Sequence, residues 1–213
     1  MRSKSNFIAG IINTHSRGGR SGRGIRSLCS RFEAALQDEY GPVSWLYTDG
    51  HKSATALTRQ AIYNGAGIIL SFGGDGTHSE VVNGFFEAEG TPINPEARLA
   101  VVDRGTGGDL RKSLGLDHDI AVLIESIHSN QVRSIDIGAY SCISSQGQTL
   151  QSFFVNVLSA GIGGEVDRRM SGYKARWLNG KGMYALAVLQ TFMTYKNGLF
   201  QVHIDNEPVC EEK

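Results

Sequence analysis

The chain has 213 residues with 21 basic and 21 acidic side chains, so its formal net charge is zero at pH 7. This length suits one large domain or a domain and a half, and the balanced charge excludes a general electrostatic attraction to nucleic acid. The three cysteines, Cys29, Cys142 and Cys210, stand far apart. This spacing argues against a zinc site or a disulfide framework and indicates a reducing compartment.

No apolar run in the sequence approaches the length of a transmembrane helix. The apolar stretch Phe7–Ile12 is also too short for a signal peptide. We therefore predict a cytoplasmic protein with no transmembrane segment and no nucleic-acid partner, which meets a membrane only at its surface.

Strand and helix patterns alternate over the first 130 residues. Short apolar runs predict buried strands at Phe7–Asn13, Val43–Tyr47, Gly67–Leu70 and Arg98–Val102. Apolar residues at helical spacing predict the buried faces of four helices: Ile25, Leu28, Phe32 and Leu36; Ala54, Leu57 and Ala61; Val81, Val82, Phe85 and Phe86; Leu110 and Leu114. Such alternation is typical of an α/β protein with a parallel sheet. The loops after the strands then meet at one edge, where ligands of these sheets bind.

The loop after the third strand contains Gly73, Gly74 and Gly76 around Asp75. Glycines between a strand and a helix let an anion approach bare backbone N–H groups at the helix N-terminus. Asp75 would repel a phosphate unless a divalent cation or a transferable proton intervened. We predict a phosphate site here; the alternative is a tight turn with an incidental aspartate. The segment Thr77–Glu80 fits a capping box and predicts that the helix starts at Thr77.

The loop after the first strand, Thr14–Gly24, is rich in glycine and arginine. The guanidinium groups of Arg17 and Arg20 could pair with phosphate oxygens. The alternative interpretation is a solvated loop.

Beyond about residue 130 the pattern changes to alternation. Ile135, Ile137 and Ala139 predict a half-buried antiparallel strand, with a hairpin loop at Ser144–Gln148 and a return strand at Thr149–Leu158. We therefore place domain boundaries at residues 1–130 and 131–213.

The last fifty residues combine a basic stretch, a helix and a hairpin. Basic and aromatic side chains suit an anionic membrane surface or a solvated connector: Arg168, Arg169, Tyr173, Lys174, Arg176, Trp177 and Lys181. A helix starts near Gly180, with a predicted core stripe of Tyr184, Val188, Thr191 and Tyr195. Phe200–Ile204 predicts a strand, Asp205 and Asn206 a turn, and Val209 the beginning of a return strand.

The central loop also carries a family resemblance. Gly73–Thr77 followed by Glu80–Gly84 resembles the signature of the diacylglycerol kinase catalytic domain, a family that includes bacterial lipid kinases, sphingosine kinases and ceramide kinases. NAD kinases share the first five residues and phosphofructokinases have a near variant. The extension through Asn83 and Gly84 favours the lipid kinases.

Three further loops resemble motifs of the same family. Asn13 and Ser16 match an Asn-Pro-x-Ser-Gly loop, Thr48 and His51 match a nucleotide-contacting threonine before a Gly-His-Ala helix start, and Thr106 and Asp109 match a Pro-x-Gly-Thr-x-Asn-Asp loop. Departures from the family pattern are Thr14 and Arg17 in the first loop and Asp103, Arg104 and Gly108 in the last.

The resemblance implies an NAD-kinase-like nucleotide domain followed by the start of a smaller β-sandwich domain, apparently truncated. It implies ATP-dependent phosphorylation of a lipid hydroxyl, diacylglycerol or a sphingoid-type alcohol, with Mg²⁺. Asp75 would organise the magnesium or the attacking hydroxyl, and Arg17 or Arg20 would neutralise developing charge. The implied nucleotide residues are Asn13, Ser16, Thr48, Gly73, Gly74, Asp75, Gly76, Thr77, Glu80, Thr106 and Asp109; the implied substrate residues are Asp136 and His51.

Two alternatives stay open: a kinase of a soluble substrate such as NAD, and a nucleotide- or lipid-binding protein without turnover. In the resembling family the β domain continues further and brings an Asp-Gly pair whose carboxylate acts on the lipid hydroxyl. We therefore expect this chain alone to transfer phosphate poorly. We also expect an unfinished sheet edge to favour a homo-oligomer.

Overall fold

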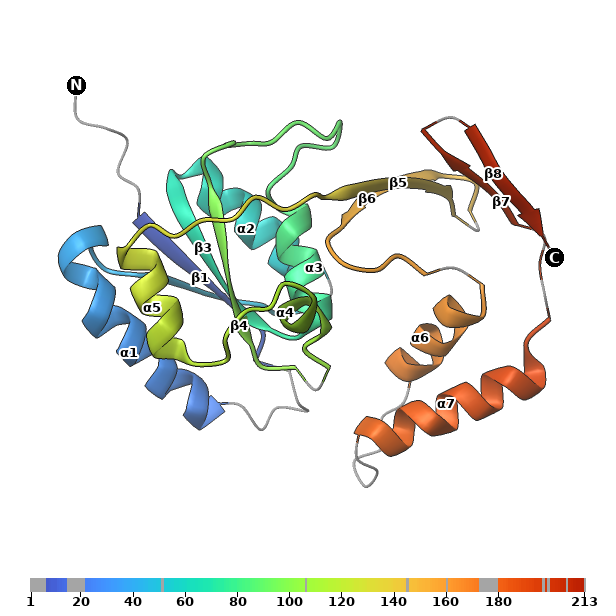
Figure 1. The fold of residues 1–213 in the computed structure, drawn as a ribbon, viewed down its shortest axis with the longest axis horizontal. Coiled ribbons are helices and arrows are strands. Elements are labelled where there is room, and N and C mark those ends of the chain that lie inside the picture. Colours follow the sequence, from blue (N-terminus) through green and yellow to red (C-terminus); the bar gives the residue numbers. More distant parts are fainter. Residues whose placement is uncertain are drawn as a thin grey trace. The chain divides into compact units, whose positions relative to one another are not determined.

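The computed structural model describes residues 7–14, 22–50, 52–105, 107–144, 146–159, 161–172, 180–196, 198, 200–205 and 207–212. Helices and strands alternate in the first two thirds of the chain (Figure 1), and the elements are β1 (Phe7–Ile12), α1 (Gly22–Tyr40), β2 (Ser44–Tyr47), α2 (Ser53–Tyr63), β3 (Ala66–Gly73), α3 (Asp75–Asn83), β4 (Arg98–Asp103), α4 (Asp109–Ser113), α5 (Ile120–His128), β5 (Gly138–Ile143), β6 (Thr149–Phe154), α6 (Ile162–Gly172), α7 (Gly180–Thr194), β7 (Phe200–Ile204) and β8 (Glu207–Glu212).

The chain folds as two compact units, Met1–Asn156 and Val157–Lys213. The unit boundary falls later than the domain boundary predicted near residue 130, because the β5–β6 hairpin belongs to the first unit. The predicted division into domains stays a prediction. Within the described ranges, no helix is both long and apolar enough to cross a bilayer.

The first unit is built on a parallel sheet with strand order β2-β1-β3-β4. The predicted α/β architecture is therefore confirmed. From β1 the chain moves outward to β2, and then returns past β1 to form β3 on its other side. The strand order reverses between β1 and β3, and this reversal marks the point where ligands bind in such sheets.

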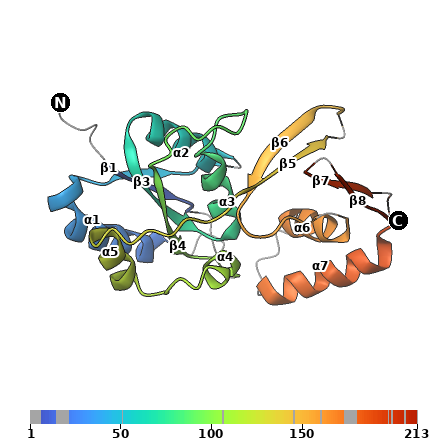
Figure 2. The ribbon, with the colours of Figure 1, turned by 45° about the horizontal axis from the view of Figure 1, so that its top comes forward.

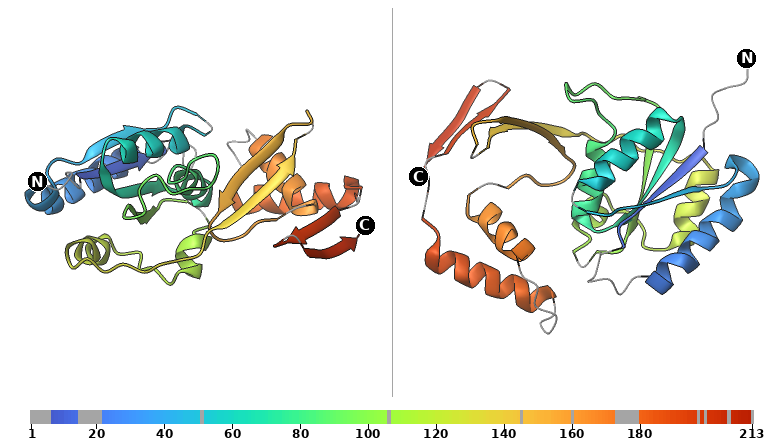
Figure 3. Two further views of the ribbon diagram at one scale, coloured as in Figure 1. Left: turned by 90° about the horizontal axis from the view of Figure 1, so that it is seen from above. Right: turned by 180° about the vertical axis from the view of Figure 1, so that it is seen from behind.

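Helices cover both faces of this sheet (Figure 3). Alternation along β1 sends Ile8 and Ile12 into a core with α1 and α5, and Ala9 and Ile11 into a core with α2 and α3. The predicted helix faces are confirmed in α1, α2 and α4: the buried members are Ile25, Phe32, Leu36, Ala54, Ala61 and Leu110.

The predicted end of α3 is wrong. The helix stops at Asn83, Gly84 is its C-cap, and Phe86 pairs with Pro92 in an isolated β-bridge. Val81 and Val82 are buried in the helix as predicted. The helical spacing of apolar residues continues past Gly84, although the helix does not. At Gly84 the chain approaches α2 closely, because a Cβ there would lie 2.7 Å from the Thr55 carbonyl oxygen.

The β5–β6 hairpin is shorter than predicted. It pairs Gly138–Ile143 with Thr149–Phe154 around the expected loop, whereas 131–137 lies outside any strand. Ile135 is accordingly exposed rather than half-buried in a strand. The two strands end together because Phe154 pairs with Gly138 at the last position of the ladder.

In the second unit, α6 packs beside α7, and β7 and β8 form an antiparallel two-stranded sheet (Figure 2). Helix α7 starts at Gly180 as predicted, but the predicted stripe is only partly buried. Thr191 is buried as predicted, Tyr184 and Val188 are exposed, and Ala187 is buried although it was not predicted. The return strand β8 begins at Glu207, before the predicted Val209. A β-sandwich in this unit stays a prediction.

Candidate functional site

The strand ends β1 and β3 are joined directly at the point where the strand order reverses. The backbone N–H of Asn13 donates to the Phe72 carbonyl at 3.0 Å, and Asn13 Nδ2 donates to Thr77 Oγ1 at 2.9 Å. Thr77 therefore does not cap α3, and the predicted capping box is wrong. The helix starts at Asp75 with Gly74 as its N-cap and no side-chain cap. The hydroxyl of Thr77 instead orients the Asn13 amide.

A cavity of about 310 Å³ opens beside this contact, and it is lined by Asn13, Thr48, Asp49, Gly50, Ala54, Thr77 and Glu80. Four of these residues were predicted to hold nucleotide: Asn13, Thr48, Thr77 and Glu80. Thr48 lines the same cavity because its N–H donates to the Ile12 carbonyl at 2.9 Å, and this bond holds the end of β2 beside β1. Asp49, Gly50 and Ala54 were not predicted as site residues, although Asp49 and Gly50 directly follow Thr48 and Ala54 lies in the first turn of the next helix.

The two glycine loops, after β3 and after β4, touch backbone to backbone. The N–H of Arg104 donates to the Gly73 carbonyl at 2.6 Å, and a Cβ on Gly105 would lie 2.7 Å from Gly74 Cα. A Cβ on Gly74 would likewise meet Gly105 Cα at 3.0 Å. Glycine is therefore required at Gly74 and Gly105 by this close approach. By contrast, a Cβ on Gly76 would meet no heavy atom within 4 Å.

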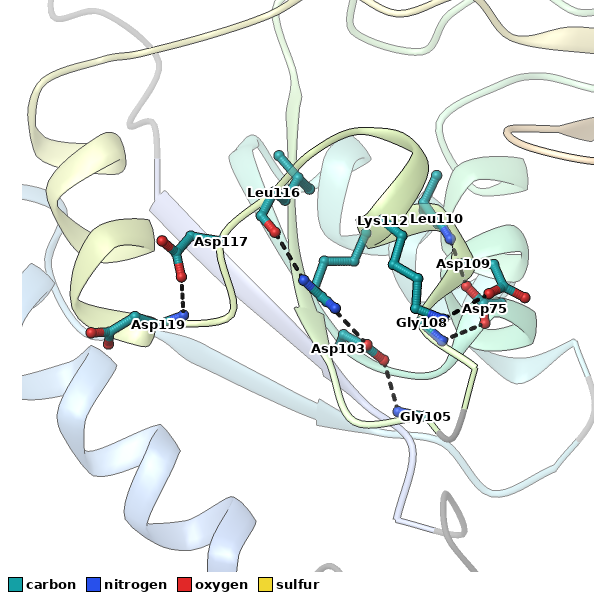
Figure 4. Close-up of polar contacts among 11 residues, drawn as sticks. Asp75, Asp103, Gly105, Gly108, Asp109, Leu110, Lys112, Leu116, Asp117 and Asp119 are labelled. Atoms are coloured by element: carbon teal, nitrogen blue, oxygen red, sulfur yellow. Dashed lines mark hydrogen bonds and ion pairs between the residues drawn. The ribbon is translucent and has the colours of Figure 1, made fainter. Parts of the chain in front are cut away.

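The Asp75 carboxylate holds the start of α4 (Figure 4). Its Oδ2 accepts from the N–H of Gly108 at 3.1 Å, and its Oδ1 accepts from the N–H of Leu110 at 2.9 Å. Burial raises the pKa of Asp75, but these backbone donors, together with nearby His78, outweigh burial and lower the pKa below its ordinary value. A carboxylate with a lowered pKa is a weak base, so the geometry favours a positioning role.

The loop after β4 departs from the family pattern at Asp103 and Gly108, and the two departures fit together. The Asp103 carboxylate, whose side chain is 8% exposed, accepts from the Gly105 N–H at 2.9 Å and lies 3.5 Å from Arg111 Nε (Figure 4). Gly108 has φ +65°, and a Cβ there would collide with Asp103 Oδ2. Asp103 thus occupies space that a side chain at position 108 would fill. Sequence reasoning noted both residues and missed this coupling.

His78 is a second residue that the sequence did not reveal. It is 1% exposed, its Nδ1 lies 2.7 Å from Ser71 Oγ, and its Nε2 is buried with no hydrogen-bond partner among the described residues. Burial lowers the pKa of His78, and the carboxylates of Asp103 and Asp75 oppose that shift. A neutral imidazole therefore lies beneath the two glycine loops.

Two further predicted site residues, Asp109 and Asp136, lie in the described ranges. Asp109 opens α4 and pairs with Lys112 at 3.1 Å on the exposed surface (Figure 4). Asp136 is exposed and lies in 131–137, before β5. The other predicted residues lie outside the described ranges: Ser16, Arg17, Arg20, His51 and Thr106.

A metal ion held by protein side chains alone does not fit the described part of the chain. There, no group of three or more histidine, cysteine, aspartate or glutamate side chains is close enough to bind one. A magnesium ion bound mostly by nucleotide phosphates needs only one or two carboxylates. Asp75 could supply one, because each of its oxygens retains a second lone pair.

Comparisons with known proteins agree on one family. The family described as "Diacylglycerol kinase catalytic domain" matches residues 9–140. A diacylglycerol kinase of Bacillus subtilis (strain 168) is 29% identical over 160 residues, which are 71% of this chain and 48% of that protein. One from Staphylococcus haemolyticus is 29% identical over 114 residues, which are 54% of this chain and 30% of the relative.

A crystal structure of a diacylglycerol kinase from Bacillus anthracis (strain Sterne) superposes with a TM-score of 0.50 at 24% identity. The match covers 70% of this chain and 49% of that one. This chain therefore spans at most about half the length of these relatives. Because the family match extends over more than half of the sequence and includes β1 to β4, the chain belongs to the diacylglycerol kinase catalytic domain family.

Proposed function

We propose that this chain carries the nucleotide-binding part of a lipid kinase, which transfers the γ-phosphate of ATP to a lipid hydroxyl. The observation that carries the proposal is the cavity at the reversal of strand order, lined by Asn13, Thr48, Thr77 and Glu80. In open α/β sheets a ligand occupies this position. The membership of the family supports ATP as the phosphate donor and diacylglycerol or a sphingoid-type alcohol as the acceptor.

In this proposal the cavity side chains bind the nucleoside part and the first turn of α3 receives the phosphates. Gly76 leaves open space beside its backbone, which suits the approach of an anion to helix N–H groups. Bound Mg²⁺ would neutralise phosphate charge, with Asp75 as its protein carboxylate. Asp75 would also keep the two glycine loops in place. Ser16, Thr106 and Asp109 would contact the nucleotide from the neighbouring loops.

Arg17 and Arg20 are proposed to neutralise charge on the transferred group, and Asp136 and His51 to face the lipid. Membrane contact is proposed through the basic stretch that begins at Arg168. Arg168 Nη2 and Arg169 Nε lie 2.6 and 2.9 Å from Glu165 Oε1, so part of that positive charge is already paired. Association with a lipid surface and a homo-oligomer remain parts of the proposal.

Calorimetry tests the site by measuring the affinity for MgATP in a variant whose added side chain fills the cavity. Gly50 lines the cavity, and a Cβ there would meet no heavy atom within 4 Å. Gly50→Leu should therefore fold normally and bind MgATP at least tenfold more weakly. Gly164 in α6 is equally open, so Gly164→Leu is the matched control and should bind like the wild type. Equal affinities in all three proteins would contradict the proposed location.

A transfer assay with radiolabelled ATP then identifies the acceptor. The panel should contain diacylglycerol, a sphingoid alcohol and NAD, each with and without anionic vesicles. Because this chain alone is expected to transfer phosphate poorly, we expect weak label, and on a lipid. Label on NAD alone would contradict a lipid acceptor, and MgATP binding with no label above background on any alcohol would favour a binding protein without turnover.

A further inference from the structure

Arg104 is a charged residue that the established family pattern does not explain, because an apolar residue is usual at its position. Its backbone is fixed to the central loop, since its N–H donates to the Gly73 carbonyl at 2.6 Å. Its side chain reaches the first turn of α1, because a Cβ on Gly24 would lie 3.3 Å from Arg104 Nη2. The guanidinium therefore lies at the carboxyl edge of the sheet, next to the proposed phosphate site.

Among the described residues, the Arg104 guanidinium has no hydrogen bond or ion pair of the kind that Arg59 and Arg111 make. Three arginines in the described part of the chain have a buried Nε without a hydrogen bond: Arg59, Arg104 and Arg111. Arg59 Nη2 donates to the Phe86 carbonyl at 2.8 Å, and Arg111 Nη1 donates to the Leu116 carbonyl at 3.1 Å. Arg111 also lies 3.5 Å from Asp103. Among the described residues, Arg104 has no comparable side-chain contact.

The guanidinium of Arg104 lies beside the N-terminus of α1. The N-terminus of a helix carries a partial positive charge, and the first turn of α1 contains no acidic residue. Asp103, the nearest carboxylate in sequence, is already engaged by Gly105 and Arg111. A partly buried cation beside a positive helix end is unfavourable without a counterion. The arrangement is therefore that of a site completed by an anionic ligand.

We propose that Arg104 is a phosphate-binding residue, which pairs with a phosphate group of the bound nucleotide between the central loop and the first turn of α1. This inference rests on the proposed nucleotide site and adds a residue to it. A guanidinium offers two parallel N–H donors that match phosphate oxygens. The unliganded chain holds this group in position at a cost in stability, and the ligand removes that cost.

The test combines stability and binding in Arg104→Gln, Arg104→Lys and the control Arg98→Gln. Arg98 opens β4 and Arg104 directly follows the last residue of β4, so each glutamine variant removes one positive charge at one end of the strand. Arg98 Nη1 donates to Asn130 Oδ1. Without ligand, Arg104→Gln should unfold at the same or higher urea concentration than the wild type. It should bind MgATP and tripolyphosphate roughly 10- to 100-fold more weakly, the range for a lost charge-assisted pair.

Arg104→Lys keeps the charge but loses the two parallel N–H donors of the guanidinium, so its affinity should lie between those of the wild type and Arg104→Gln. Arg98→Gln should bind like the wild type. Wild-type binding that Arg104→Gln leaves unchanged would overturn this inference alone. A folded wild type that binds neither MgATP nor tripolyphosphate would overturn the proposed function and this inference together. Tripolyphosphate binding that depends on Arg104 without MgATP binding would support an anion site and contradict the nucleotide.

Discussion

Helix α3 is tied to later parts of the chain at both ends, and the two ties use different chemistry. At its start, Asp75 accepts from the N–H groups of Gly108 and Leu110. At its end, Asn83 Oδ1 accepts from Ser152 Oγ at 2.7 Å and from the Phe153 N–H at 2.9 Å, while Nδ2 donates to the Phe153 carbonyl at 2.9 Å. The first tie holds the start of helix α4, and the second holds strand β6.

The residue types follow from what each partner presents. A carboxylate can only accept, and the first turn of a helix such as α4 presents only free N–H groups. An amide both donates and accepts, so Asn83 pairs with both backbone groups of Phe153 as a neighbouring strand would. The Phe86 and Phe153 rings stack at 4.5 Å beside this contact. Two residues of the family signature, Asp75 and Asn83, therefore have a structural role, because they fix α4 and β6 to helix α3.

The largest expected effect comes from breaking the tie at the end of α3. Asn83→Asp replaces the donor by an acceptor that faces the Phe153 and Ser79 carbonyls. We expect a loss of about 3 kcal/mol in the free energy of unfolding, since several hydrogen bonds of about 1 kcal/mol each are lost or reversed. Hydrogen exchange should show that Phe153 loses protection while β1 and β3 keep theirs.

Asn94→Asp is the control, because within the described ranges the Asn94 side chain uses its Oδ1 alone, which accepts from the Glu96 N–H at 3.1 Å. That variant should unfold like the wild type. Similar losses in both variants would show that the amide of Asn83 is not the source of stability.

Breaking the tie at the start of α3 should have the next largest effect. Asp75→Ala leaves the N–H groups of Gly108 and Leu110 without their acceptor, and should cost about 2 kcal/mol in urea unfolding at pH 7. Asp109→Ala removes a neighbouring exposed carboxylate, whose ion pair among the described residues is with Lys112, and should cost less than about 0.5 kcal/mol. Equal midpoints for the two variants would contradict the structural role of Asp75.

Between the two ties, His78 makes stability depend on pH. Its pKa is lowered in the folded chain from the ordinary 6.5, mainly by burial. Between the folded value and 6.5 the unfolded chain binds more protons, so the free energy of unfolding falls as the pH decreases through this window. One such group contributes at most about 1.4 kcal/mol per pH unit.

Urea unfolding at several pH values between 7.5 and 5 measures this slope. In His78→Gln the slope over this window should be smaller than in the wild type. An unchanged slope would show that another group causes the acid sensitivity.

The smallest expected effect on stability comes from Gly76→Ala, which should change stability and MgATP affinity in opposite directions. Gly76→Ala should stabilise the apo chain by about 0.5–1 kcal/mol, because glycine is a poor helix residue and the added Cβ meets open space. Gly74→Ala should destabilise it, because its Cβ would press on Gly105. If phosphates approach the first turn of α3, Gly76→Ala should nevertheless bind MgATP more weakly by calorimetry. Undiminished affinity would place the phosphates elsewhere.

Local sequence patterns determined the architecture of the first unit. Apolar runs and helical spacing predicted β1 to β4 and the buried faces of α1 and α2, because a periodic pattern specifies which side of an element avoids water. Strand–helix alternation then implied a parallel sheet with its loops at one edge. This places the loops after β1, β2 and β3 at one edge, and the family resemblance then implied Asn13, Thr48, Thr77 and Glu80 as nucleotide-binding residues.

Only the tertiary structure decided what individual polar groups do. Thr77 was expected to cap its own helix, but its hydroxyl accepts from Asn13, which lies 64 positions away. Asp75 and Asn83 find partners 33 and 70 positions away. A hydrogen bond forms where two groups come within about 3 Å, and no local pattern contains that proximity. The same reason explains α7, where the packing of α6 with α7 buries Thr191 of the predicted stripe together with Ala187 and leaves Tyr184 and Val188 exposed.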